Sequence, residues 1–176
     1  IPVLMILFAL GGSTYGMAEE TIPFYALLIP VMMAVGFDTV VAVAIVLVGS
    51  QVGCLASTVN PFATGVASQA VGISMGEGIG LRFLMFVVLL AISIAYVYRY
   101  ASKVEKDPTK SLVYKQREED IKHFDIDSIG RQESITKRQK HVNILFFITF
   151  GIMIISLIPW TTLNKNFTIF ESLTNW

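Results

Sequence analysis

The chain has 176 residues, with 13 Lys and Arg balanced by 13 Asp and Glu, a hydrophobic content of 54% and a mean hydropathy of +0.66. This composition, with apolar runs that approach the roughly 20 residues of a membrane span, is typical of an all-α integral membrane protein. A single cysteine, Cys54, excludes an internal disulfide, a cysteine-based zinc site and a redox pair.

Residues 1–37 are predicted to form a re-entrant helical hairpin. The apolar run at 2–10 reaches only about half of a bilayer core, and residues 11–21 are small and polar. The next apolar run, 22–37, is again short and contains Pro23 and Pro30. These lengths favour two half-helices joined by a polar tip. The alternative is two full spans with an ordinary loop outside the membrane.

Residues 38–74 are predicted to form one transmembrane helix broken near its middle. Asp38 is expected to cap its N-terminus. Pro61 removes a backbone donor and disfavours a helical conformation at Asn60, so an unwound stretch is expected near 57–61. The alternative is a proline kink in which Ser57 and Thr58 bond to their own helix backbone.

The remainder is predicted as a glycine-rich turn at 76–80, a full transmembrane helix at 81–100, a charged connector at 101–141 and a final segment at 142–176. That segment opens with a second full span at 143–162. Basic residues at both ends of the connector, among them Arg99 and Lys140, place it in the cytoplasm of a multi-pass protein of the cytoplasmic membrane. The missing initiating Met predicts a fragment of a longer chain.

Two polar segments, 11–21 and 57–64, are predicted at membrane depth, where irregular backbone is tolerated only in a protein interior or a wet cavity. Exposed N–H groups at half-helix N-termini attract carboxylates, whereas free carbonyls and hydroxyls coordinate Na⁺ or receive a proton. The small and hydroxylated residues that would let ligand and backbone approach closely are Gly11, Gly12, Ser13, Thr14, Ser57, Thr58, Asn60 and Thr64.

Glu19 and Glu20 lie in a stretch, 1–81, without any Lys or Arg. At the bilayer midplane each ionised carboxylate costs about 2.5 to 3.5 kcal/mol, which favours a role in binding a cationic group or a coupling ion. The alternative is that both acids complement the dipole of the helix that follows, at a water-filled tip.

No nucleophile with a base, phosphate-binding glycine loop or nucleic-acid signature is present, so neither an enzyme nor a nucleic-acid partner is predicted. His123 and His141 are too far apart in sequence to predict a metal site. No cofactor is expected beyond a coupling Na⁺ or H⁺ at the site residues themselves.

The motifs Gly-Gly-Ser-Thr-Tyr-Gly-Met-Ala-Glu-Glu-Thr at 11–21 and Ser-Thr-Val-Asn-Pro-Phe-Ala-Thr-Gly at 57–65 resemble the C4-dicarboxylate anaerobic carrier-type family of the ion transporter superfamily, with its basic amino acid antiporters as the nearest branch. The resemblance implies two inverted repeats, each with a re-entrant hairpin and a broken helix whose tips meet at the substrate and ion site. It assigns to that site Ser13, Thr14, Glu19, Glu20, Ser57, Thr58, Asn60 and Thr64.

The leading hypothesis is therefore a fragment of a secondary active transporter for small carboxylate-bearing metabolites. Basic amino acid antiport is preferred, and the resemblance implies an elevator-type mechanism, a homodimer and contact with membrane lipid. A C4-dicarboxylate carrier coupled to Na⁺ or H⁺ is the alternative. A membrane scaffold or sensor that uses the connector at 101–141, and a passive channel, represent other classes.

Overall fold

The structure is a computed structural model that describes residues 1–124, 140–142, 144–145, 148–149 and 152. The chain divides into one unit from Ile1 to Arg131 and a second from Gln132 to Trp176. Within the described residues all regular structure is helical, which confirms the prediction of an all-α chain. Most of the second span predicted at 143–162 lies outside the described residues, and the helices below all belong to the first unit.

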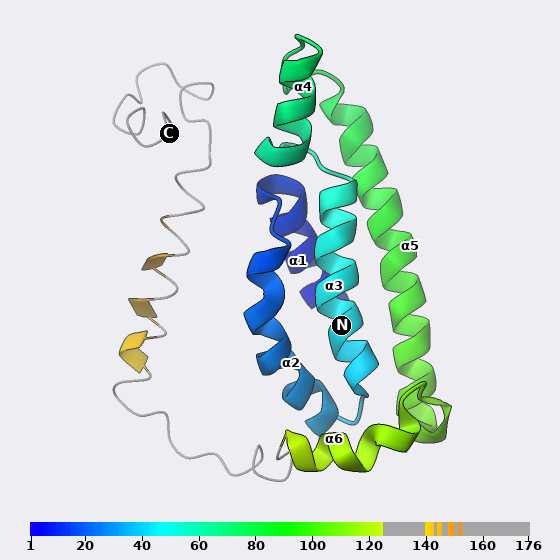
Figure 1. Cartoon of the computed structure of the whole chain (residues 1–176). Helices are drawn as coiled ribbons and strands as arrows, with labels where there is room; N and C mark the ends of the chain where they lie inside the picture. The colour runs from blue at the N-terminus through cyan, green and yellow to red at the C-terminus, as the bar shows by residue number, and fades with distance from the viewer. Residues whose placement is uncertain (125–139, 143, 146–147, 150–151, 153–176) are drawn as a thin grey trace. The chain divides into compact units, whose positions relative to one another are not determined.

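Helices α1 (Pro2–Tyr15) and α2 (Ile22–Ala34) form a hairpin closed by the short 3-10 turn η1 (Glu19–Thr21) (Figure 1). Proline stands at the start of both helices, where its missing N–H is no loss. The sequence predicts that α1 ends near Leu10, but the helix continues to Tyr15. Only 16–18, between Tyr15 and Glu19, lack helical structure at the tip.

The small residues near the end of α1 serve close helix packing, which explains why the helix does not stop at the first glycine. A Cβ atom on Gly12 would lie 2.3 Å from the Ser50 carbonyl oxygen, and one on Gly53 would lie 2.2 Å from the Ala9 carbonyl oxygen. The backbones of α1 and α3 (Thr39–Leu55) therefore approach as they do at glycine-lined interfaces of membrane helices.

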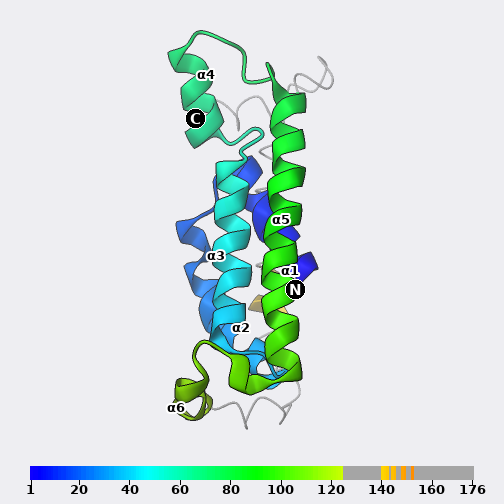
Figure 2. The same ribbon diagram turned by 90° about the vertical axis from the view of Figure 1, so that its right-hand side faces the viewer.

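Helix α3 is the central element of the unit and packs against α1, α2 and α5 (Figures 1 and 2). Its N-terminus confirms the predicted cap, because the Asp38 carboxylate accepts a 2.8 Å hydrogen bond from the Val41 amide. The main apolar core surrounds it and consists of Met5, Phe8, Leu28, Met32, Val41, Ala42, Ile45, Val46, Val97 and Ala101.

The helical path of α3 stops at Leu55, and a non-helical segment follows at 56–60. A single π-helical turn, η2 (Pro61–Gly65), and the short helix α4 (Val66–Ala70) then restore helical backbone. A turn region at 71–78 joins α4 to α5. The interruption lies where proline removes a donor, and the helix on its far side is much shorter than α3.

Helix α5 (Ile79–Lys106) is the one helix among the described residues that is long and apolar enough to cross a membrane. One face packs on the core through residues such as Phe86, Leu90 and Val97. Large apolar side chains on its other faces, among them Leu81, Phe83 and Ile92, are exposed, as expected for a surface that meets lipid or further protein. α1 and α3 are shorter apolar helices.

The start of the connector is folded against the same end of the unit as the α2–α3 turn, through η3 (Pro108–Lys110), η4 (Tyr114–Gln116) and α6 (Arg117–His123) (Figure 1). Asp38 is almost fully buried and accepts hydrogen bonds from the Tyr100 hydroxyl at 2.6 Å and the Ser111 hydroxyl at 2.5 Å. Thr39 donates to Asp120 at 3.3 Å. These bonds hold the connector onto the helices.

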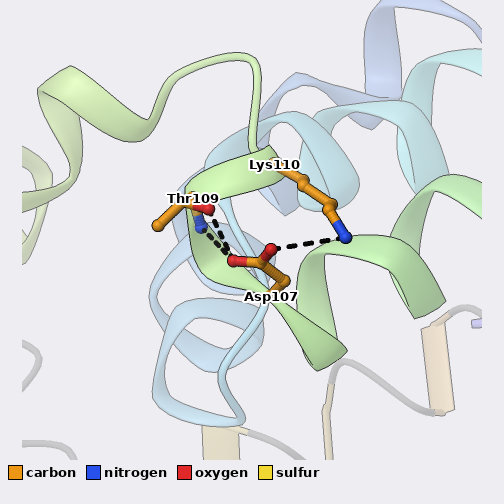
Figure 3. Close-up of polar contacts among 3 residues, drawn as sticks. All are labelled: Asp107, Thr109 and Lys110. Carbon is orange, nitrogen blue, oxygen red and sulfur yellow. Dashed lines mark hydrogen bonds and ion pairs between the residues drawn. The ribbon is translucent and has the colours of Figure 1, made fainter.

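Asp107 closes the end of α5. Its carboxylate accepts hydrogen bonds from the amide and the hydroxyl of Thr109 and lies 3.3 Å from the Lys110 ammonium (Figure 3). The Thr109 hydroxyl, aided by Lys110, lowers the pKa of Asp107 below its usual value, because both favour the charged carboxylate. This arrangement turns the chain sharply at the helix end.

Candidate functional site

The candidate site is the junction between the end of α1 and the interruption after α3. The Ser13 carbonyl, one of the four at the end of α1 without a helical partner, accepts bonds from the amides of Thr58 and Val59 at 3.2 and 3.3 Å. The Ser13 hydroxyl is 3.3 Å from the carbonyl oxygen of Ala56, the residue that follows α3. Each helix end thus supplies partners that the other lacks.

The hydroxyls of Ser13 and Thr58 also bond to each other, at 3.0 Å. The Thr58 amide donates to the Ser13 hydroxyl at 3.1 Å, and the Thr58 hydroxyl oxygen lies 3.3 Å from the Ser13 carbonyl oxygen. Ser13 is 1% exposed, so a lost partner would leave a buried polar group unsatisfied. These bonds hold the end of α1 against the non-helical segment at 56–60.

A second hydroxyl pair lies at the π-helical turn. Ser57 and Thr64 place their hydroxyl oxygens 2.6 Å apart, and the Thr64 hydroxyl also lies 3.3 Å from the Ser57 carbonyl oxygen. The pair spans the point where helical backbone resumes. Because π-helical turns occur often at functional sites, this feature strengthens the case for the region as a site.

Asn60 joins the two segments and is 3% exposed. Its side-chain oxygen accepts from the amides of Phe62 and Ala63, which caps η2, and its side-chain nitrogen donates to the Gly12 carbonyl at 3.4 Å. Gly16 has φ of +80°, and a Cβ there would lie 2.8 Å from the Asn60 amide atoms. Glycine is therefore required at position 16 for two reasons, the positive φ and the close approach of the Asn60 side chain.

The acidic tip is more open than this junction. Glu19 and Glu20 are both exposed, and the Glu20 carboxylate accepts a 3.2 Å bond from the Ala18 amide. The buried Thr21 donates to the Ala18 carbonyl at 2.5 Å. No ion pair to either glutamate occurs among the described residues. Within this part of the chain both carboxylates face solvent at the tip.

The structure brings five of the eight predicted site residues to the junction, as two hydroxyl pairs, Ser13–Thr58 and Ser57–Thr64, and the Asn60 cap. Thr14 is exposed and donates only to the Leu10 carbonyl of its own helix, at 2.6 Å. Glu19 and Glu20 occupy the adjacent tip without a direct bond to the five. Sequence reasoning missed the roles of Gly16 and Gly53, although Gly49 and Gly53 show the four-residue spacing of small residues typical of close helix contacts.

The chemistry of the junction is that of hydroxyls, amides and carbonyls rather than of strong metal ligands. Within the described residues there is no group of three or more His, Cys, Asp or Glu side chains that could hold a metal ion. Oxygen groups of this kind suit a weakly held alkali cation or the polar atoms of a small metabolite.

Comparison with known proteins shows the family of the chain. The family model described as DcuC, C4-dicarboxylate anaerobic carrier, matches residues 1–174. The chain belongs to the C4-dicarboxylate anaerobic carrier family. The resemblance drawn from the two motifs is thereby confirmed.

Two curated relatives are similar to the chain. An uncharacterized protein of Haemophilus influenzae is 40% identical over 153 residues, which cover 85% of the chain and 30% of the relative. An Escherichia coli protein named "Putative basic amino acid antiporter YfcC" is 37% identical over 114 residues, which cover 65% of the chain and 22% of that protein. The chain thus spans less than a third of the length of either relative. No solved structure matches it significantly.

Proposed function

We propose that this chain supplies the first-repeat half of the substrate and ion site of a secondary active transporter in the cytoplasmic membrane. In this proposal α1 and α2 are the arms of a re-entrant hairpin, and α3, η2 and α4 are parts of one broken transmembrane helix. The other half of the site would come from an inverted second repeat. The observation that carries the proposal is the hydrogen-bonded junction between Ser13 and Thr58.

This junction supports an elevator-type mechanism. Hydrogen bonds and glycine contacts join the end of α1 to the interruption after α3, so the two polar segments would move as one body. A substrate held between the two polar segments would then cross the membrane together with both of them, and the helices would not need to separate. The homodimer that such a mechanism generally uses as its fixed scaffold is part of the same proposal.

The substrate we propose is a basic amino acid, exchanged for another small metabolite. Glu19 and Glu20 are exposed at the tip, and residues 1–81 contain no Lys or Arg that would neutralise them. The cationic side chain of a basic amino acid would be attracted to these two carboxylates, whereas the second carboxylate of a dicarboxylate substrate would be repelled by them. The name of the Escherichia coli relative points to the same substrate class for that protein.

Exchange in proteoliposomes that contain the full-length protein tests this proposal. We expect arginine or ornithine exchange to fall at least about tenfold in the double variant Glu19→Gln, Glu20→Gln, because at an effective dielectric constant near 20 each nearby charge contributes over 1 kcal/mol. Glu77→Gln is the matched control, since Glu77 is exposed in the turn before α5. Unchanged exchange in the double variant would show that the acids do not bind the cation directly.

A C4-dicarboxylate carrier coupled to Na⁺ or H⁺ is the second candidate. The family description favours it, and the hydroxyls at Ser57 and Thr64 are suited to a coupling cation. Saturable succinate uptake that depends on Na⁺ or on a proton gradient, with no arginine exchange, would select this alternative.

A further inference from the structure

A groove of about 440 Å³ lies at the connector end of α5, away from the candidate substrate site. Its lining consists of Tyr98, Arg99, Ser102, Lys103, Lys106 and Lys110. Four of these six side chains are cationic. The volume is many times the roughly 30 Å³ share of one water molecule in the liquid, so the groove has room for a phosphate ester group.

The positive charge of the groove is not neutralised by the described part of the chain. Lys110 pairs with Asp107 at 3.3 Å, whereas Arg99, Lys103 and Lys106 form no ion pair with any described carboxylate. Glu105 is on the same helix but does not line the groove. The C-terminal dipole of α5 offsets only about half a charge. More than two positive charges remain, and the exposed side chains make them accessible.

The cations also lie on the outward face of α5. Val97, Ala101 and Val104 are buried in the unit, and at 100° per residue Arg99 and Lys106 lie on the opposite side of the helix. This separates the basic face from the core. The sequence predicts a connector of mixed, solvated charge, but at this helix end four cations and no carboxylate line the groove.

The position along α5 suggests what the groove meets. It follows directly after the apolar part of the only described helix that could span a membrane, beside the exposed rings of Tyr96 and Tyr98. Aromatic rings of this kind lie at headgroup level. The inference therefore rests on the membrane placement of α5 in the proposed function.

We propose that this groove binds the phosphate of an anionic lipid headgroup. The Arg99 guanidinium offers the fork of donors that suits phosphate oxygens, while Lys103 and Lys106 supply point charges. The hydroxyls of Tyr98 and Ser102 add neutral donors to the rest of the headgroup. Basic pockets at the cytoplasmic surface of membrane helices bind anionic headgroups in this way.

Native mass spectrometry of the full-length protein in detergent, titrated with phosphatidylglycerol or phosphatidylcholine, tests the proposal. We expect the wild-type protein to retain phosphatidylglycerol preferentially, and the double variant Lys103→Gln, Lys106→Gln to lose about tenfold or more of that preference. Lys115→Gln, Lys122→Gln is the matched control, because it removes the same charge from exposed connector positions outside the groove. Its preference should stay within about twofold of wild type.

Equal loss in both double variants would overturn the proposal, because it would show a diffuse charge effect rather than a site. Inorganic phosphate at fixed ionic strength is the second arm. If it removes bound phosphatidylglycerol at millimolar concentration, the groove takes free phosphate and the lipid assignment is wrong. Stable reconstitution of the Lys103→Gln, Lys106→Gln protein into phosphatidylcholine vesicles tests the membrane placement separately, so its failure is distinguishable from failure of headgroup selectivity.

Discussion

Ser13 and Thr58, 45 residues apart in the chain, bond to each other through both their backbones and their hydroxyls. The carbonyl of Ser13 lies in the last turn of α1, and the amide of Thr58 lies in the segment that follows α3. Hydrogen-bonding groups that a helix end normally offers to water are therefore used inside the protein. This junction fixes the spacing of the hairpin tip and the helix interruption.

Ser13→Ala should destabilise the full-length protein by about 1–3 kcal/mol, because the Thr58 hydroxyl and the Ala56 carbonyl lose a partner and the Thr58 amide keeps only the Ser13 carbonyl. The apparent melting temperature in detergent measures the effect. Thr14→Ala is the control, since its exposed hydroxyl bonds only within α1 and its loss should cost no more than about 0.5 kcal/mol. Equal melting temperatures for the two variants would contradict the buried junction.

Gly53→Ala should lower the free energy of unfolding by more than about 3 kcal/mol. Overpacking a protein interior usually costs about 1–3 kcal/mol, but here the new Cβ meets the Ala9 backbone, which cannot move aside as a flexible side chain can. Gly80→Ala is the matched change. Nothing lies within 4 Å of a Cβ at Gly80, the second residue of α5, so this variant should be neutral or more stable by about 0.5–1 kcal/mol. Thermal unfolding of both variants in the same detergent decides between close packing and simple helix propensity.

Asp38→Asn should loosen the connector while it preserves the cap of α3. An asparagine keeps one side-chain oxygen for the Val41 amide, but its amino group cannot accept the bonds now made by Tyr100 and Ser111. We expect a loss of about 1–3 kcal/mol and faster protease cleavage within 107–116. Tyr100→Phe should reproduce part of the cleavage effect, and intact connectors in both variants would contradict the tether.

Thr109→Val should raise the pKa of Asp107 toward its usual value, because the Thr109 hydroxyl is the largest cause of the lowered pKa. A carboxyl whose pKa is lower in the folded state contributes stability above its unfolded pKa and loses that contribution as the pH falls through the folded pKa. The stabilising contribution of the ionised Asp107 carboxylate is therefore lost only at a pH below the usual pKa of an aspartate. Carbon-detected NMR titration of labelled aspartate measures the shift, and an unchanged pKa in the variant would exclude the hydroxyl as its cause.

Local sequence signals predict much of the described fold. Proline at the helix starts, Asp38 before an apolar run and the uninterrupted run of α5 each have a direct physical link to the backbone, and the structure shows the expected feature in each case. The end of α1 differs from expectation because glycine has two uses. Gly11 and Gly12 suggest unwound backbone, but α3 approaches so closely at Gly12 that glycine is needed there inside a helix.

The site shows the same division between local and distant information. Hydroxyl and amide side chains in two polar segments identify Ser13, Ser57, Thr58, Asn60 and Thr64 as a group, and all five form hydrogen bonds at the junction. Their pairing depends on the approach of α1 to α3 across about 40 residues, which composition does not specify. Thr14 carries a hydroxyl as Ser13 does, but successive residues of a helix point in different directions, so the Thr14 side chain is exposed while that of Ser13 is buried.

The mutual capping of α1 and the segment after α3 also constrains biosynthesis. At about 5–20 residues per second, Thr58 leaves the ribosome a few seconds after Ser13. Until then the hairpin would present unpaired carbonyls and a buried hydroxyl to its surroundings, at a cost of several kcal/mol for each such group in lipid. We expect a hairpin truncated after Ala34 to fail to insert on its own. In the membrane placement proposed above, residues 1–60 would then enter the membrane together, with the protein-conducting channel enclosing the hairpin until residues 56–60 have been made.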